Sequence, residues 1–404
     1  MSSPVSLIPG GVTTPRGFRA AGVSAGIKAN GNPDLALLVS DTPATAAAVF
    51  TISRAQAAPV LVSQEHLSRT RGVARAVVVN SGCANACTGD AGLQVARDMA
   101  TETAALVGCP VEQVLVASTG VIGVSLSMDR VRRGLPVAFR ALAADQGPMA
   151  ARAIMTTDLF PKEAAAKVTL AGDATITIGG MAKGAGMIEP MMATMLGFVT
   201  TDAAVPAVLL DRALREAVND TFNAITVDGE CSTNDCVMLL ASGASGVAVD
   251  ESTYGAFLAG LTAVCRELAL AIVRGGEGAT KLITVTVNGA ATSDEARRAA
   301  KAIANSLLVK TAIHGGDPNW GRLIAVAGRA GVAFDLSKAA VVIGRTVLFK
   351  DGRPYDEAAP EAAAYLKGTD LSLAVDLGSG SATSTVWTCD LSAEYVRINA
   401  EYRT

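Results

Sequence analysis

The sequence is poor in the side chains on which many enzymes depend for catalysis or metal binding. It contains two histidines, and its seven cysteines form no CxxC pair. Tetrahedral zinc needs Cys or His ligands close together, and neither histidine lies near Cys83 or Cys87 in the sequence. The KGAG segment lacks the ending of a Walker loop, and Gly184 and Gly186 are not followed by the third glycine of GxGxxG. We therefore expect no metal site and no nucleotide held by a standard loop.

Long basic runs and long apolar runs are also missing. The net charge is −3, and Lys and Arg form no long block, which disfavours nucleic-acid and anionic-membrane partners. No run reaches the roughly 18 uncharged apolar residues of a transmembrane helix. The first residues, MSSPVSLIPGGVTTPRGF, show no signal-peptide pattern. We expect a cytoplasmic protein with neither nucleic acid nor membrane as a partner.

Aromatic residues make up only 4% of the chain, whereas alanine and glycine are plentiful. A core built from small and β-branched side chains lets backbones approach closely. At roughly 150 residues per domain, a chain of this length forms two or three lobes.

Short β-rich runs alternate with helical patterns from end to end, which indicates a layered α/β or α+β protein. The expected strands are 73–79, 113–118, 167–178 as a hairpin turning at Gly172-Asp173, 282–287 and 339–348. The expected helices are 93–106, 128–144, 208–218, 254–273 and 293–304, the last opened by a Thr292/Glu295 capping box. Polar, glycine-rich loops lie between them at 80–89, 118–123, 156–158, 228–235, 275–281 and 314–322, and several follow an expected strand.

One threonine stands out in the segment MAKGAGMIEPMMATML. A threonine hydroxyl is a poor nucleophile and needs a base within hydrogen-bond reach, which a chain with two histidines must find elsewhere. If the Ala193–Thr194 peptide bond is broken, the new α-amine of Thr194 has a pKa of about 7.7 to 8.0 and can act as that base. The hydroxyl can make this cut itself by attacking the carbonyl of Ala193. The Thr119-Gly120 turn can supply N–H and hydroxyl donors for the developing oxyanion.

Two other interpretations of these patterns remain open at this point. Thr194 can simply lie in a buried helix and bond to a carbonyl one turn earlier. Gly22, Ser24 and Gly26 match the GxSxG nucleophile motif, but the next segment, IKANGNPD, does not predict the helix that this motif requires. We interpret GxSxG as an ordinary turn.

The chain resembles the ornithine acetyltransferase family, also called glutamate N-acetyltransferase, of the cyclic route of arginine biosynthesis. Eight segments stand in the family's order: NSGCANACTG, STGVIG, AIMTTD with Pro161-Lys162, GGMAKGAGMIEPMMATML, FNAITVDGECSTND, GEGATK, NSLLVKTAIHGGDPNWGR and YVRINAEYRT. Two residues depart from the pattern: Ala185 stands where serine is common, and Met191 where asparagine is common.

The resemblance implies self-cleavage between Ala193 and Thr194 into an α segment, residues 1–193, and a β segment, residues 194–404. The two segments would intertwine in one catalytic unit and assemble as an α2β2 heterotetramer. The implied fold is an αββα sandwich similar to N-terminal nucleophile hydrolases but differently connected, with a smaller C-terminal lobe at about 282–404. Site residues are implied too: Thr194 as nucleophile, Thr119 and Gly120 as oxyanion hole, and Thr157, Lys183, Thr194, Glu277, Asn399 and Thr404 as substrate contacts.

Charge matching agrees with two of these residues. N-acetylornithine and glutamate share an α-carboxylate and differ in side-chain charge, so one site for both needs a cation and a carboxylate. Lys183 and Glu277 fit these roles, although each can also be an ordinary charged loop residue. Asn399 and Thr404 have the position of a frayed tail and enter only through the resemblance. His314 and Trp320 lie in a family motif, and we expect structural or intersubunit roles for them.

The leading hypothesis is a ping-pong enzyme that moves acetyl from N-acetylornithine to glutamate through an acetyl ester on Thr194, without a cofactor. A bifunctional enzyme that also accepts acetyl from acetyl-CoA is the nearest alternative. An N-terminal nucleophile hydrolase or aminopeptidase, and a non-catalytic assembly protein, are the others.

Overall fold

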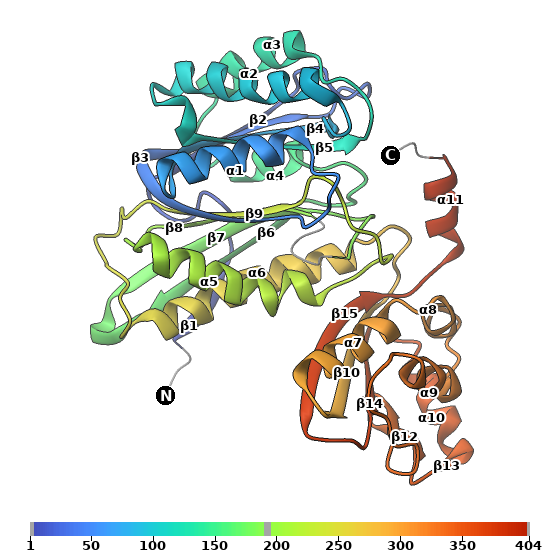
Figure 1. Cartoon of the computed structure of the whole chain (residues 1–404). Coiled ribbons are helices and arrows are strands. Elements are labelled where there is room, and N and C mark those ends of the chain that lie inside the picture. The colour runs from blue at the N-terminus through green and yellow to red at the C-terminus, as the bar shows by residue number, and fades with distance from the viewer. Residues whose placement is uncertain (1–3, 190–194, 402–404) are drawn as a thin grey trace. The chain divides into compact units, whose positions relative to one another are not determined.

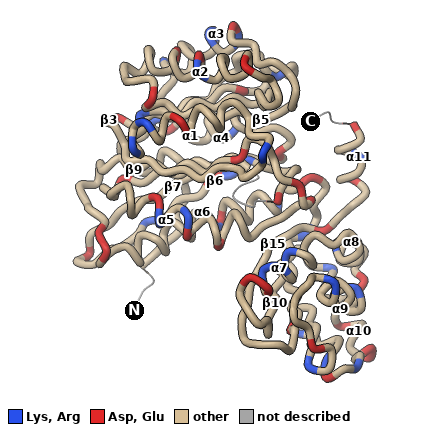
Figure 2. The backbone as a smooth tube through the Cα atoms, in the orientation of Figure 1, with Lys and Arg blue, Asp and Glu red and all other residues tan. Residues whose placement is uncertain are grey.

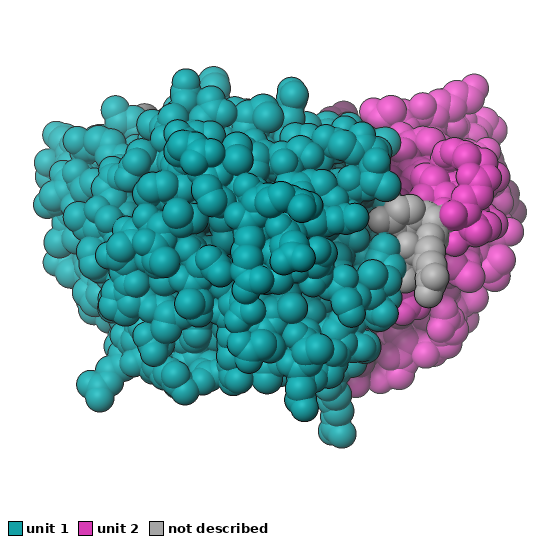
Figure 3. Space-filling view, turned by 90° about the horizontal axis from the view of Figure 1, so that it is seen from above, with its two compact units in different colours: residues 1–223, 231–272, 404 teal, residues 224–230, 273–403 magenta. Residues whose placement is uncertain are grey.

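The computed structural model describes residues 4–189 and 195–401. These residues form two compact units: 4–189, 195–223 and 231–272 belong to the first, and 224–230 and 273–401 to the second (Figure 3). Each unit has its own sheet.

The described strands of the first unit form a nine-stranded sheet. They are β1 (Val5–Ile8), β2 (Phe18–Val23), β3 (Leu35–Phe50), β4 (Val73–Cys83), β5 (Val114–Val121), β6 (Lys162–Thr169), β7 (Thr175–Lys183), β8 (Leu196–Thr201) and β9 (Cys236–Ala241). Their order is β1-β6-β7-β8-β9-β3-β4-β5, and β2 pairs with β3. Most neighbours are antiparallel, whereas β4–β5 and β8–β9 are parallel.

The long strand β3 turns this sheet into two layers. Residues 35–39 pair with β4, the register shifts before Ala44, and residues 45–50 pair with β9. Bulges of this kind bend a strand and increase its twist. The sheet therefore folds over at β3, with β2, β4 and β5 in one layer and β6 to β9 in the other (Figure 1).

Helices cover both outer faces of the folded sheet (Figure 1). The outer helices are α2 (Gly89–Val107) and α3 (Met128–Arg140) on the β2–β5 layer, and α5 (Ala207–Asn219) and α6 (Tyr254–Arg274) on the other. The helix α1 (Ala58–Thr70) lies along the edge strand β5, where Ser63 bonds to the N–H and carbonyl of Val116. The short helix α4 (Gly147–Ala153) contacts β2, β3, β6 and β7. Its Ala150 and Ala153 share a core with Leu38, Met181 and Phe198, from both layers. The first unit is thus an αββα sandwich, as expected.

Small residues bring α6 close to the sheet. A Cβ on Gly260 would lie 2.3 Å from Val168 Cγ2, and one on Gly180 would lie 2.9 Å from Leu268 Cδ1. A larger residue at either position would push helix and strands apart. Length and apolar composition alone would let α6 span a membrane. Its apolar side chains Leu261, Val264 and Leu268 instead have no exposed surface, as expected for a core helix.

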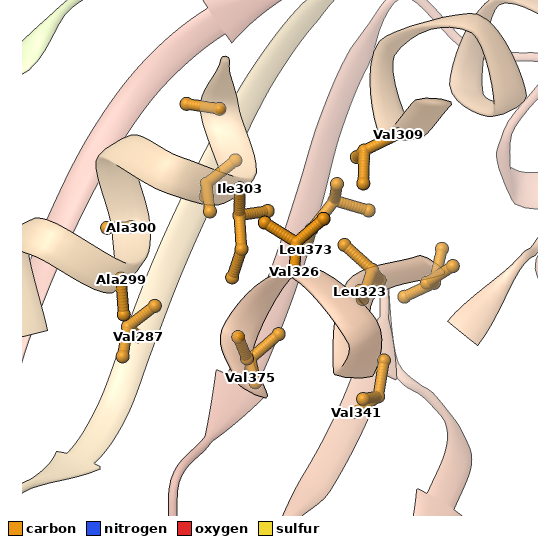
Figure 4. Close-up of a cluster of buried hydrophobic side chains, with 14 of the residues drawn as sticks. Val287, Ala299, Ala300, Ile303, Val309, Leu323, Val326, Val341, Leu373 and Val375 are labelled. Carbon is orange, nitrogen blue, oxygen red and sulfur yellow. The ribbon is translucent and has the colours of Figure 1, made fainter. Parts of the chain in front are cut away.

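The second unit is a six-stranded sheet with helices packed on one face. Its strands are β10 (Leu282–Ala290), β11 (Ala340–Ile343), β12 (Thr346–Lys350), β13 (Arg353–Pro354), β14 (Asp370–Asp376) and β15 (Ala382–Cys389), in the order β13-β12-β11-β14-β10-β15. The helices that contribute to its core are α7 (Ser293–Ala304), α8 (Leu307–Gly315), α9 (Trp320–Gly328) and α10 (Ala359–Tyr365). A further helix, α11 (Ala393–Glu401), has no buried residue and lies apart from the sheet (Figure 1). Figure 4 shows Ile303 of α7 and Leu323 of α9 meeting Val375 and Leu373 of β14 in the core.

Lys and Arg are interspersed with Asp and Glu along both units (Figure 2). The densest basic cluster of the sequence lies on α3. There Arg132 pairs with Glu102 and Asp98 of α2 at 3.0 and 3.5 Å, with nearly half of its side chain exposed. It is an ordinary solvated, ion-paired helix face.

Several boundaries differ from the sequence expectation. The helix α2 begins at Gly89 instead of Leu93, and β4 and β5 continue into the expected loops, to Cys83 and Val121. The α3 helix ends at Arg140 instead of Ala144, because Ala143 leaves the helix to exchange backbone hydrogen bonds with Ala20 of β2. The expected strand 339–348 is two strands, β11 and β12, which pair after a turn at Gly344. Gly344 has φ +63°, a left-handed conformation that favours glycine. The other expected elements are confirmed, including the cap of α7, where Thr292 Oγ1 accepts the Glu295 N–H.

Core packing between the two layers gives a stability prediction. Phe198 of β8 has no exposed surface, so Phe198→Ala should lower the free energy of unfolding by about 3 to 5 kcal/mol. Urea unfolding followed by circular dichroism measures this. The control Leu7→Ala, at a half-exposed side chain, should change it by less than about 1 kcal/mol. Equal effects of the two substitutions would contradict this view of the core.

Candidate active site

Residues from both layers of the first unit meet where β5 and β7 end. Lys183, the last residue of β7, donates a hydrogen bond from Nζ to Thr119 Oγ1 of β5 at 3.1 Å. Both residues are 8% exposed. Two predicted site residues, 64 positions apart in sequence, are therefore in direct contact.

The β8 strand begins at the same edge of the sheet. Lys183 pairs with Leu196, and Leu196 pairs in turn with Cys236 of β9. The Cys236 N–H also donates to the carbonyl of Met195. Lys183 and the beginning of β8 are therefore neighbours across the sheet.

Gly120 lies directly on the backbone of the neighbouring strand. It pairs with Gly82, and a Cβ on Gly120 would come within 2.4 Å of the Gly82 carbonyl carbon. Its φ of +129° also disfavours other residues. The Thr119-Gly120 turn therefore needs glycine at its second position.

Two asparagines fix the neighbouring loops. Asn80 donates to the carbonyl of Cys83 at 2.8 Å. Asn234 Nδ2 donates to the carbonyls of Ala84 and Ser118 at 2.6 and 2.9 Å. Asn234 therefore connects its own loop to the segment after β4 and to the residue of β5 that precedes Thr119.

The buried carboxylate of Asp158 organises this region. Its Oδ1 accepts the Lys162 ammonium at 2.6 Å and the Gly184 N–H at 2.7 Å, and its Oδ2 accepts the Thr156 N–H at 3.0 Å. Burial alone would raise the pKa of Asp158, but the charges of Lys183 and Lys162 lower it to about 2. In the sequence, Asp158 stands at the end of the polar segment 156–158, and no pattern there indicated a role for it. The four-residue spacing from Asp158 to Lys162 is the only sign of the pair in the sequence.

Asp235 is a second buried carboxyl, one residue before β9. It is 3% exposed, and its Oδ2 has no hydrogen-bond partner within the described residues. Burial raises its pKa well above the usual range, although a bond from Ser232 and the charge of Lys183 oppose this. The two buried carboxyls of this region therefore differ: burial dominates at Asp235 and raises its pKa, whereas the neighbouring lysines dominate at Asp158 and lower its pKa.

In the second unit, Asn399 of α11 contacts Glu277. Asn399 Nδ2 donates to Glu277 Oε2 at 2.9 Å, and Glu277 is 7% exposed. Earlier on the same helix, Tyr395 donates to Asp228 at 3.3 Å, and just before it Ser392 donates to the Gly278 carbonyl at 2.6 Å. The spacing of 392, 395 and 399 brings one helix face to the Glu277 loop. Asn399 is thus part of an anchored helix.

The remaining predicted site residues make no contact that bears on the chemistry within the described residues, or they lie outside them. Thr157 is half-buried and directly precedes Asp158. Ala193, Thr194 and Thr404, and the departure Met191, lie outside the described residues. The other departure, Ala185, is 1% exposed and follows Gly184. No three His, Cys, Asp or Glu side chains in the described ranges come together as possible metal ligands.

Comparison with known proteins shows one family over nearly the whole chain. Residues 19–404 match the ArgJ family. The arginine biosynthesis bifunctional protein ArgJ of Synechococcus sp. is 51% identical over 98% of both chains. The chain belongs to the ArgJ family. The expected family and an acyltransferase of arginine biosynthesis are thereby confirmed.

Two solved structures are also similar to this ArgJ-family chain. The arginine biosynthesis bifunctional protein argJ of Bacillus halodurans is 45% identical, covering 52% of this chain and 100% of its own, with a TM-score of 0.50. The ornithine acetyltransferase of Mycobacterium tuberculosis, complexed with ornithine, is 45% identical over 47% of this chain and 100% of its own, with a TM-score of 0.44.

His314 stabilises the Glu277 loop of this ArgJ-family chain. Its Nδ1 lies 2.7 Å from Asp390 Oδ2, and Asp390 also accepts the N–H groups of Thr280 and Lys281 at 2.8 and 2.9 Å. Although burial opposes it, these bonds lower the pKa of Asp390. The residues that follow Glu277 are therefore fixed by a buried carboxylate that His314 also contacts.

Trp320 also has a structural role. Its ring stacks on Phe349 with centroids 5.1 Å apart, and its Nε1 donates to Asp356 at 3.3 Å.

The Asp158 pair gives a prediction for stability and its pH dependence. Asp158→Asn leaves the buried Lys162 ammonium without a counter-ion and should cost about 3 to 5 kcal/mol at pH 7. The folded pKa of about 2 lies below the unfolded value of about 3.9. Asp158 therefore stabilises the fold above pH ~4, and this contribution is lost as the pH falls toward ~2.

Urea unfolding of wild type and variant at pH 7, 5 and 3 checks this. The difference between the two proteins should shrink as the pH falls. Asp173→Asn, at an exposed carboxyl, is the matched control. A difference that grows toward low pH would contradict the account of Asp158.

Proposed function

We propose that this chain transfers acetyl from N-acetylornithine to glutamate through an acetyl ester on Thr194, in the cytoplasm and without a cofactor. The observation that carries the proposal is the contact of Lys183 with Thr119. It brings a cation to the Thr119-Gly120 turn at the edge where β8 begins, two residues after Thr194. A carboxylate-binding group and an oxyanion-binding turn thus share one site.

Thr119 is suited to stabilising an oxyanion. Because its Oγ1 accepts the Lys183 ammonium, its hydroxyl hydrogen is directed away from the lysine. That hydrogen and the Gly120 N–H can donate to the oxygen of a tetrahedral intermediate. The ammonium also makes the hydroxyl a stronger donor.

The chemistry proceeds in two half-reactions. The α-amine of Thr194 takes the proton of its own hydroxyl, and the oxygen attacks the acetyl carbonyl of N-acetylornithine. The amide C–N bond breaks, and ornithine leaves with that proton. The glutamate amine then attacks the ester and loses a proton to the α-amine of Thr194. The ester C–O bond breaks, the α-amine passes this proton to the Thr194 oxygen, and N-acetylglutamate leaves. The donor brings its own acetyl group, so the exchange requires neither metal nor organic cofactor.

The substrate contacts follow from matching the charges of the side chains to those of the substrates. Lys183 binds the α-carboxylate that both substrates share, and Glu277 binds the side-chain ammonium of ornithine. Asn399 positions Glu277 through its 2.9 Å hydrogen bond. Thr157 and Thr404 provide further contacts to the substrates.

Self-cleavage before Thr194 produces the active form. We propose an α segment of residues 1–193 and a β segment of residues 194–404, assembled as α2β2. The solved Bacillus halodurans chain is covered completely by about half of this one. A cut near the middle of the sequence produces chains of that length, which supports the proposal.

Replacing the nucleophile tests this function. Thr194→Ala removes the hydroxyl that makes the cut and carries the acetyl group, so it should give one uncut chain without transferase activity. Intact mass spectrometry and an assay of N-acetylglutamate formation measure the two effects. Thr194→Ser keeps a hydroxyl and should still be cut. An uncut Thr194→Ala protein with full activity would refute the proposal.

A test of Glu277 examines donor recognition. Glu277→Gln removes the negative charge and should raise the KM for N-acetylornithine at least tenfold, since a hydrogen bond between charged groups contributes about 1.5 to 3 kcal/mol. The KM for glutamate should rise less. Glu361→Gln, at an exposed carboxyl, is the control. Equal increases for both substrates would show that Glu277 does not distinguish them.

The bifunctional alternative is favoured by the similarity to the bifunctional protein ArgJ of Synechococcus sp.. Purified protein given acetyl-CoA and glutamate alone would form N-acetylglutamate if the enzyme has this second activity, and none if it lacks it. Hydrolysis of N-acetylornithine that added glutamate does not divert would favour the hydrolase alternative.

A further inference from the structure

The proposed substrate contacts leave one charge unmatched. Glutamate carries two carboxylates, whereas Lys183 supplies one cation. A carboxylate transferred from water into a partly buried site is costly unless a cation or several donors compensate it. A second cation beside the oxyanion turn would compensate it, and this inference rests on the proposed function.

Lys28 lies beside the oxyanion turn. Its side chain packs on Gly82, where a Cβ would come within 2.9 Å of Lys28 Cγ. Gly82 pairs with Gly120 in the β4–β5 register. The aliphatic part of Lys28 therefore contacts β4 at the residue that pairs with Gly120.

A buried aspartate holds Lys28 in this position. Asp34 has no exposed surface, and its two carboxylate oxygens accept the N–H groups of Ala25 and Lys28 at 2.6 and 2.8 Å. The Lys28 ammonium donates to the Pro33 carbonyl at 2.8 Å. An ammonium has three donors, so two remain for a ligand within the described surroundings. These hydrogen bonds hold the segment around Lys28 in place and leave two donors of its ammonium available.

Charged groups of both signs surround Lys28. Burial lowers the pKa of Lys28, the carboxylates of Asp34 and Asp158 raise it, and the charge of Lys183 lowers it further. Glutamate has a carboxylate for Lys183 and a second one for Lys28, whereas a substrate with one carboxylate can engage only one of the two lysines.

The other buried lysine of this region is already occupied. Lys162 has a side chain without exposed surface and is paired with Asp158. Lys28 is half-buried and has donors to spare.

We propose that Lys28 binds the side-chain carboxylate of the glutamate acceptor and so selects glutamate in the second half-reaction. Lys28 and Glu277 then have opposite tasks. Glu277 recognises the ammonium of the donor's side chain, and Lys28 recognises the carboxylate of the acceptor's side chain. Lys183 serves the carboxylate that the two substrates share.

The variant Lys28→Met tests the proposal, because methionine keeps most of the aliphatic stem over Gly82 and removes the charge. Each half-reaction is measured by itself. Ornithine release from N-acetylornithine without acceptor reports the first, and kcat/KM for glutamate and for glutamine reports the second. The ratio of glutamate to glutamine should fall at least tenfold. Lys28→Arg should keep the preference, and Lys167→Met, at an exposed lysine, should leave it unchanged.

Several outcomes would overturn the inference. An unchanged glutamate-to-glutamine ratio would show that Lys28 only ties its loop to Pro33. Equal losses in ornithine release and in glutamate use would assign Lys28 to the shared α-carboxylate or to folding. If Lys28→Met is not cut before Thr194, the glutamate-to-glutamine ratio is measured with Lys28→Gln, whose side chain fits the same space. An unchanged ratio in that variant would likewise refute the inference. Failure of the wild type to release ornithine would instead refute the proposed function itself.

Discussion

The candidate site depends on the buried carboxylate of Asp158. It neutralises Lys162 and accepts the Gly184 N–H, and thereby fixes the residue that follows Lys183. Lys183 can then reach Thr119 in the other sheet layer. Without a charge at Asp158, two lysines would share a region poor in water, and the cost of burying them would oppose the fold. The ion pair therefore links the stability of the sandwich to the geometry of the site.

Small residues make this arrangement possible. Gly82 and Gly120 allow β4 and β5 to meet without side chains, which leaves room for the Lys28 stem. The low aromatic content and the many glycines of the sequence predicted such close approach of backbones. The site is thus built from backbone donors and a few charged side chains. That composition suits a reaction in which one threonine is to supply both nucleophile and base.

Most of the layered fold could be predicted from apolar periodicity and turn residues, because these patterns are local. The end of α3 could not, since it is set by backbone pairing of Ala143 with the distant Ala20. Contacts such as Lys183 with Thr119 and Asn399 with Glu277 join residues far apart in sequence. The four residues were expected in the site because of the family motifs. Charge matching alone indicated only Lys183 and Glu277. Asp158 and Lys28 were missed because their roles depend on burial and on neighbours that a single sequence does not reveal.

The most direct test of the account is peptide mass spectrometry of active protein incubated with N-acetylornithine in the absence of glutamate. The account predicts a peptide that begins at Thr194 and carries one acetyl group, which disappears when glutamate is added. An active protein whose chain is continuous through Ala193 and Thr194, with no acetyl group on Thr194, would contradict it.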